Sequence, residues 1–362
     1  MRATEAIDDA RRAMEVCNAC RYCEGYCAVF PAMTLFRSFS NGDLSYLANL
    51  CHGCSGCFYA CQYAPPHEFG INLPKTFAEV RLESYEEYAW PRGLARLFER
   101  NGLVMALATA IGIAAVFLLT ALLTDPALLF SPVTGPGAFY AIIPWWVMVT
   151  TAGGTFAFAL VALGMGFRNF WKDTGGTAAE LTRPKPLFRA LRDALSLKYL
   201  GGGGDGCNDL DERYSMHRRW SHHALFYGFM LCFAATCVAT VYDHFLHLQA
   251  PYPFFSLPVL LGTVGGIGMT VGGAGLLWVK LARDPAPTAR RVLGADYGLL
   301  VLLLLTAITG LLLLALRHTG AMASLLAVHL GVVLALFVML PYCKFVHSVY
   351  RSGALLRFAL RR

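Results

Sequence analysis

Charged residues are scarce in this chain: Asp, Glu, Lys and Arg make up 15% of its 362 residues, against 56% hydrophobic residues. The first hundred residues are quite polar, so the remainder is more apolar than this average, which excludes an ordinary water-soluble protein. The chain also lacks a Rossmann fingerprint, which is a glycine-rich turn between a strand and a helix. It therefore offers no evident flavin or nicotinamide site of its own.

Long apolar runs fill the part beyond residue 100. A membrane-spanning helix needs about 20 mostly apolar residues. Six stretches meet this requirement, at 102–123, 142–166, 222–246, 257–280, 296–316 and 321–346. The fourth is rich in glycine, which permits close helix–helix contact in lipid. The sequence predicts an all-α protein with an N-terminal domain at 1–100 and a six-span domain at 101–362, the latter with a long loop at 167–221.

Lys and Arg are almost absent from three loops, 124–141, 247–256 and 317–320, where Arg317 stands alone. The alternate loops and the C-terminal tail carry many basic residues. Because basic loops stay on the cytoplasmic side, we expect both termini and the N-terminal domain to be cytoplasmic in a bacterial-type inner (plasma) membrane. The net charge of +7 follows from this bias. We therefore expect a lipid bilayer as partner and no nucleic acid.

The N-terminal domain contains two copies of one cysteine pattern, C-x2-C-x2-C-x3-C. The first run is Cys17, Cys20, Cys23 and Cys27, and the second is Cys51, Cys54, Cys57 and Cys61. This spacing is typical of a protein that binds two [4Fe–4S] clusters, in which the fourth cysteine of each run ligates the other cluster. We expect one cluster on Cys17, Cys20, Cys23 and Cys61, and the other on Cys51, Cys54, Cys57 and Cys27.

Zinc and disulfides are the alternative interpretations of these cysteines. Structural zinc sites mostly use paired C-x2-C knuckles with a longer spacer. Disulfides require an oxidising compartment, whereas the loop charges place this domain on the cytoplasmic side. Neither run is followed by the usual proline, since Ala28 and Gln62 come next.

Histidines within and beside the spans form a second candidate site. His329 and His347 are 18 residues apart in or next to the last span, which on one helix is five turns, or about 27 Å on the same face. His222 and His244 similarly share a face of the third span. Paired imidazoles are common axial ligands of haem. We expect b-type haem, with His347 and His222 or His223 at the inner position and His329 and His244 at the outer one.

The loop at 167–221 has a candidate amphipathic helix from Pro186 to Leu200, followed by four glycines and Cys207. It either lies on the membrane surface, which we favour, or docks against the cysteine-rich domain or a soluble partner. Cys207 alone does not indicate a ligand.

The span region, with its pair of histidines, resembles the di-haem cytochrome b subunit of respiratory nitrate reductase. The first hundred residues resemble the α-helical ferredoxins of succinate dehydrogenase and heterodisulfide reductase. The combination resembles the tricarballylate/citrate utilisation protein B family, over essentially the whole chain. The motifs that carry this resemblance are Cys-Asn-Ala-Cys-Arg-Tyr-Cys-Glu-Gly-Tyr-Cys at 17–27, Cys-His-Gly-Cys-Ser-Gly-Cys at 51–57 and Gly-Gly-Gly-Gly-Asp-Gly-Cys-Asn at 201–208.

This resemblance implies a partner, a soluble FAD-dependent dehydrogenase that oxidises tricarballylate, whose reduced flavin the chain would reoxidise. The cofactors carry such chemistry and the protein sets distance and potential. We expect electrons to pass through two [4Fe–4S] clusters and haem b to a membrane quinone. The reverse flow, from quinol to a soluble reductase, remains open. The alternatives from other classes are a transporter with a redox-sensing domain and a zinc-binding scaffold. Against a transporter, the spans lack discontinuous helices with buried carboxylates. Asp243 and Asp296 stand at span ends, where we expect their side chains to reach toward water.

Overall fold

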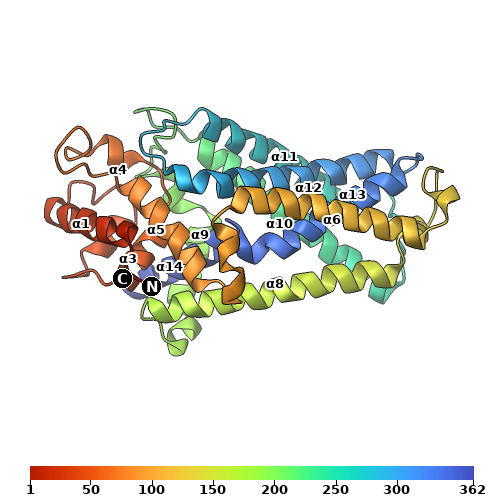
Figure 1. Cartoon of the computed structure of the whole chain (residues 1–362), viewed down its shortest axis with the longest axis horizontal. Helices are drawn as coiled ribbons and strands as arrows, with labels where there is room; N and C mark the ends of the chain where they lie inside the picture. The colour runs from red at the N-terminus through yellow and green to blue at the C-terminus, as the bar shows by residue number, and fades with distance from the viewer.

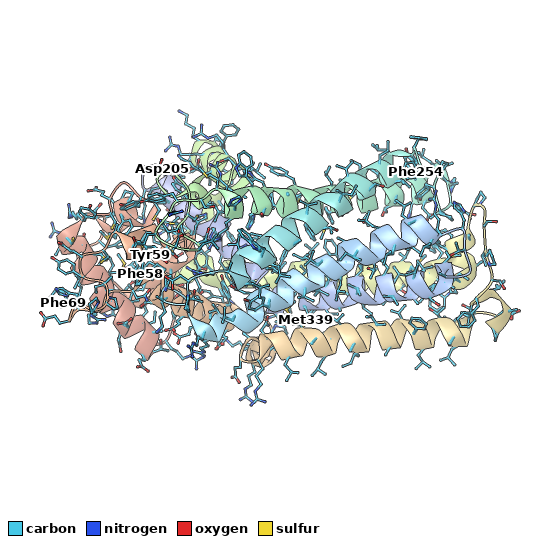
Figure 2. All side chains as sticks on the ribbon, turned by 90° about the horizontal axis from the view of Figure 1, so that it is seen from above. Phe58, Tyr59, Phe69, Asp205, Phe254 and Met339 are labelled. Atoms are coloured by element: carbon cyan, nitrogen blue, oxygen red, sulfur yellow. The ribbon has the colours of Figure 1, made fainter.

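The computed structural model describes all 362 residues and contains helices without any β-sheet, as the sequence predicts. A group of short helices lies at one end of an elongated molecule, and long helices extend from it along the long axis (Figure 1). Both chain termini lie at the end with the short helices (Figure 1). Phe69 is at the tip of this end and Phe254 is at the other, as Figure 2 shows.

Six of the helices are long and apolar enough to cross a membrane. They confirm the predicted number of spans. Their bounds are α6 (Asn101–Leu123), α8 (Trp145–Asp173), α10 (His217–Leu246), α11 (Leu257–Leu281), α12 (Leu293–Leu316) and α13 (Met322–Met339).

Five short helices make up the N-terminal part: α1 (Glu5–Cys20), α2 (Val29–Met33), α3 (Asn41–Leu50), α4 (Gly56–Tyr59) and α5 (Leu73–Tyr88). Their ends follow local capping chemistry. The hydroxyl of Ser40 accepts the N–H of Asp43, whose carboxylate accepts the N–H of Ser40 in return, a capping box that starts α3. Arg21 adopts a left-handed conformation and ends α1 inside the first cysteine run. The two cysteine runs thus lie where helices end and begin.

Glycines bring α10 and α11 together. A Cβ atom built on Gly265 would lie 2.7 Å from the carbonyl oxygen of Gly228 and 2.8 Å from the amide nitrogen of Cys232. Such distances are shorter than van der Waals contact, so only glycine permits this approach. The glycine-rich fourth span therefore packs as expected for helices in lipid.

The last predicted span is not one continuous helix. α13 ends at Met339, a short 3-10 turn follows (η6, Leu340–Tyr342), and a separate helix, α14, runs from Val346 to Leu360. Pro341 lies in the break. A proline interrupts a helix because it has no N–H to donate and its ring clashes with the preceding turn. The expectation that His329 and His347 leave one face of a single helix is therefore wrong.

Asp296 also differs from expectation. Its position at the end of a span suggested a carboxylate that reaches toward water, but its side chain is only 4% exposed. It accepts hydrogen bonds from the ammonium groups of Lys280 and Lys344. These three side chains join α11, α12 and the segment before α14 in one ion triad around a buried carboxylate.

The long loop combines both expected arrangements. α9 (Pro184–Leu195) exposes the apolar side chains Leu187, Phe188 and Leu191, as a helix that lies in a membrane interface does. After it, residues 200–216 turn back onto the second cysteine run, where the N–H of Asn208 donates to the carbonyl of Cys54 at 2.9 Å. The loop therefore both presents an apolar face and docks on the N-terminal part.

Candidate redox site

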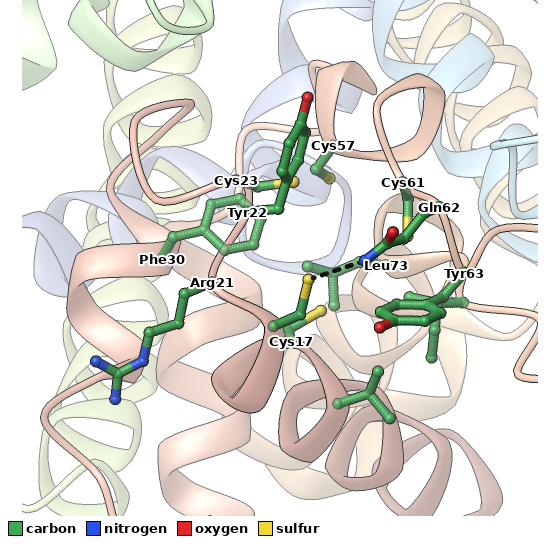
Figure 3. A pocket seen from close by; sticks show the side chains of 13 residues that line it. Cys17, Arg21, Tyr22, Cys23, Phe30, Cys57, Cys61, Gln62, Tyr63 and Leu73 are labelled. Carbon is green, nitrogen blue, oxygen red and sulfur yellow. Dashed lines mark hydrogen bonds between the residues drawn. The ribbon is translucent and has the colours of Figure 1, made fainter.

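The thiols of both runs surround two neighbouring hollows. The first hollow has about 440 Å³ of free space, its open mouth included. Figure 3 shows this hollow, with the side chains of Cys17, Cys23, Cys57 and Cys61 around it. Its lining also includes Cys20. Cys61, the last cysteine of the second run, thus lies with the first three cysteines of the first run, as a crossed arrangement requires.

The second hollow repeats this arrangement with the runs exchanged. It has about 370 Å³ of free space, its open mouth included, and is lined by Cys51, Cys54, Cys57 and Cys27. Cys57 borders both hollows. The first hollow is therefore lined by five cysteines and the second by four, and each set includes the four thiols that the crossed assignment predicts for one cubane.

Burial and hydrogen bonding shift the pKa values of several of these thiols. Burial, together with the nearby Cys61 thiol, raises the pKa of Cys17 and of Cys23 to about 12. The pKa of Cys54 shifts in the opposite direction, because a hydrogen bond from Cys207 lowers it to about 7. A bound metal centre deprotonates coordinating thiols outright.

Cys207 lies directly behind the second hollow. Its side chain is fully buried and packs with Cys54 and Leu200. Its thiol is 3.0 Å from the carbonyl oxygen of Leu200, and its backbone pairs with Ser215 in an isolated β-bridge. Cys207 does not line either hollow. The structure gives it a place as a neighbour of a candidate ligand.

Three guanidinium groups hold the loop of the second run. Arg218, from α10, donates to two consecutive loop carbonyls at 2.6 and 2.8 Å. Arg351, from α14, donates to the carbonyl of Cys51 at 2.9 Å, and Arg81, from α5, donates to the same oxygen at 3.2 Å. The loop of the second cysteine run is thereby hydrogen-bonded to α10, which carries His222, and to α14, which carries His347.

His222 and His347 come together at the inner end of the spans. Their ring centroids are 6.3 Å apart and their planes are nearly perpendicular. Two imidazoles that bind one metal from opposite sides through bonds of about 2 Å have centroids about 6 Å apart. The Nδ1 atom of His222 is buried without a hydrogen-bond partner. This pair fits the axial ligands of an inner haem.

The orientation of His347 supports the same assignment. Its Nδ1 atom is 2.5 Å from the carbonyl oxygen of Lys344, which leaves Nε2 free, and a backbone partner of this kind fixes the tautomer of a metal-binding histidine. Burial, with smaller effects from Arg351 and Lys344, lowers the pKa of His347 well below its usual value. The ring is therefore neutral, the form that binds iron.

The other predicted histidines lie elsewhere. Nε2 of His223 is 3.2 Å from the carbonyl oxygen of Ser196, so this ring faces the long loop. Nδ1 of His329 lies 3.0 Å from the hydroxyl of Thr309. His244 packs against Trp145 and lies beside Asp243. Of the two candidates for the inner position, the structure therefore brings His222, and not His223, together with His347. No ring contact joins His329 to His244.

Arg218 and Arg351 were not predicted as site residues, since their charge served only as an indicator of membrane topology. A signal was present, because Arg218 precedes His222 by four residues and Arg351 follows His347 by four. Residues four apart on a helix share a face. Each helix with an inner histidine therefore directs an arginine from the same face toward the second cysteine run.

Comparison with known proteins gives two family matches that together cover nearly the whole chain. The model of a family described as Citrate utilization protein B matches residues 96–362, and that of the Citrate utilization protein B Fer4-like domain matches residues 10–87. The chain is also similar to the Citrate utilization protein B of Escherichia coli. The two are 49% identical over 360 residues, which cover 99% of this chain and 93% of that protein. No solved structure matches the chain.

Proposed function

This chain belongs to the citrate utilization protein B family, and we propose that it is a membrane electron conduit. It accepts electrons from the reduced FAD of a soluble dehydrogenase, for which tricarballylate is the substrate that the family resemblance favours. It passes them through two [4Fe–4S] clusters and b-type haem to a membrane quinone. The Fer4-like match over residues 10–87 is consistent with the iron–sulfur part of this proposal.

The observation that carries the proposal is the continuity between the two cysteine hollows and the inner histidine pair. The loop of the second run is hydrogen-bonded to Arg218 and Arg351, one helical turn from His222 and His347 respectively. Clusters held by the thiols and a haem held by these imidazoles would supply one-electron steps between a two-electron flavin and a two-electron quinone. The chain's own part is to fix their order and spacing.

The same arrangement supports a proposed orientation in the membrane and a proposed electron acceptor. The basic loops, both termini and the cysteine runs share one end of the molecule (Figure 1), and the charge bias assigns this end to the cytoplasm. A soluble dehydrogenase would reach the first hollow from that side. A quinone suits the opposite partner because it is lipid-soluble. The proposal includes the inner haem alone, because His329 lies beside Thr309 and His244 packs against Trp145, with no contact between the two rings.

Cysteine variants test the proposal. Cys20→Ser removes a thiol of the first run and Cys54→Ser one of the second, and each is expected to abolish electron transfer. The assay uses membranes that contain the full chain, reduced flavin as donor and a quinone analogue as acceptor. Cys237→Ser, at an exposed position of α10, is the matched control and should retain the wild-type rate. Unchanged quinone reduction in either cluster variant, with normal insertion, would contradict the relay.

A further inference from the structure

Positive charge is distributed unequally around the two cysteine runs. At the second run, Arg351 and Arg81 both donate to the carbonyl oxygen of Cys51, at 2.9 and 3.2 Å, and neither forms an ion pair with a carboxylate. Arg218 donates to the next carbonyls of the loop, but Asp209 pairs with it at 3.1 Å and offsets its charge. Two uncompensated positive charges therefore face this loop.

The first run has no comparable charge. Arg21 lies at the edge of its hollow, and its Nε donates to the carbonyl of Asn18 at 3.0 Å. Figure 3 shows the guanidinium group of Arg21 turned away from the labelled cysteines. The side-chain amide of Gln62, an uncharged donor, lies 3.8 Å from the sulfur of Cys20. The first run thus receives hydrogen bonding without a facing cation.

This difference in positive charge affects the reduction potentials of the two clusters. Reduction adds negative charge to a cluster, so a nearby cation favours the reduced form, and net charge, hydrogen bonds and solvent exposure all set the potential. Burial lowers the reduction potential, because it disfavours the added negative charge, and Cys51 and Cys54 are each only 8% exposed. The same burial strengthens charge–charge attraction because the local dielectric constant is low. Because two guanidinium groups are hydrogen-bonded to the loop itself, we expect their effect on the potential to exceed that of burial.

We propose that Arg81 and Arg351 hold the reduction potential of the cluster at the second run above that of the cluster at the first. Electrons then pass downhill toward His222 and His347, that is, toward the membrane. This inference rests on the proposed function, whose two clusters it orders. Each transfer oxidises the first cluster by one electron and reduces the second by one, with no bond or proton exchanged.

The test is an EPR-monitored redox titration of the purified full-length protein. In Arg351→Gln we expect the midpoint of the higher-potential cluster to fall, with the other cluster unchanged. At a fixed ambient potential, the ratio of reduced to oxidised second cluster should drop about tenfold, which corresponds to about 59 mV for one electron. Arg351→Lys preserves the charge and should retain most of the wild-type potential. Arg2→Gln removes an arginine whose side chain is 83% exposed and should leave both potentials unchanged.

Arg81→Gln provides a second route to the same result, from a different helix, if Arg351→Gln fails to assemble. Intact clusters with unshifted potentials in the glutamine variants would overturn the proposal and leave the proposed function standing. A shift confined to the lower-potential cluster would also overturn it, because the order would then be reversed. Absence of both cluster signals from the wild-type protein would instead refute the proposed function, and this inference with it.

Discussion

Removal of the Asp296 carboxylate should destabilise the fold at the junction between the spans and the N-terminal part. Asp296 is 4% exposed and accepts from Lys280 and Lys344, whose side chains are 19% and 34% exposed. Asp296→Asn leaves both ammonium groups facing each other without their shared counter-ion. Breaking a buried ion pair from one side costs about 3–5 kcal/mol. Because water reaches Lys344, we expect a loss near the lower end, about 3 kcal/mol.

The measurement is the free energy of unfolding in mixed micelles, titrated with a denaturing detergent and followed by tryptophan fluorescence. Asp205→Asn makes the same charge change at an exposed loop position and should alter the free energy by no more than about 0.5 kcal/mol. Replacing all three side chains at once, with Asp296→Leu, Lys280→Met and Lys344→Met, should recover most of the loss, since an apolar substitute for a buried ionic group is often neutral. A loss below about 1 kcal/mol in Asp296→Asn would refute this reasoning.

Two further predictions concern packing and haem. Gly265→Ala should cost about 1–3 kcal/mol of unfolding free energy by forcing α10 and α11 apart. Gly164→Ala, where an added Cβ meets nothing within 4 Å, is the control and should cost nothing. Equal effects of the two substitutions would contradict the close packing of α10 and α11. His347→Ala should remove a low-spin haem signal from the optical spectrum, and His223→Ala, whose ring faces Ser196, should keep it. An unaltered spectrum in His347→Ala would exclude that residue as a ligand.

Features set by short-range patterns were predictable from the sequence. Six apolar runs gave the number of spans because lipid requires about 20 apolar residues in succession. The family resemblance, which rests on the cysteine runs and the fused spans, is confirmed by the comparisons. The all-helical architecture is also confirmed.

Features that depend on contacts between distant segments were not predictable. The break at Pro341 was hidden by a hydropathy that stays high through 321–346, although proline is a known helix breaker. The role of Asp296 could not be read from its position, because Lys280 and Lys344 lie 16 and 48 residues away. The contact between residues 200–216 and the second cysteine run likewise depends on tertiary structure.

The most direct test of the electron conduit is an anaerobic optical and EPR spectrum of the purified protein, before and after reduction. The account predicts signals from two [4Fe–4S] clusters together with the sharp α-band of a low-spin b-type haem. Cluster signals without a haem band would contradict the relay through His222 and His347 and leave a membrane-bound ferredoxin. A colourless protein that contains zinc and no iron would contradict the account as a whole.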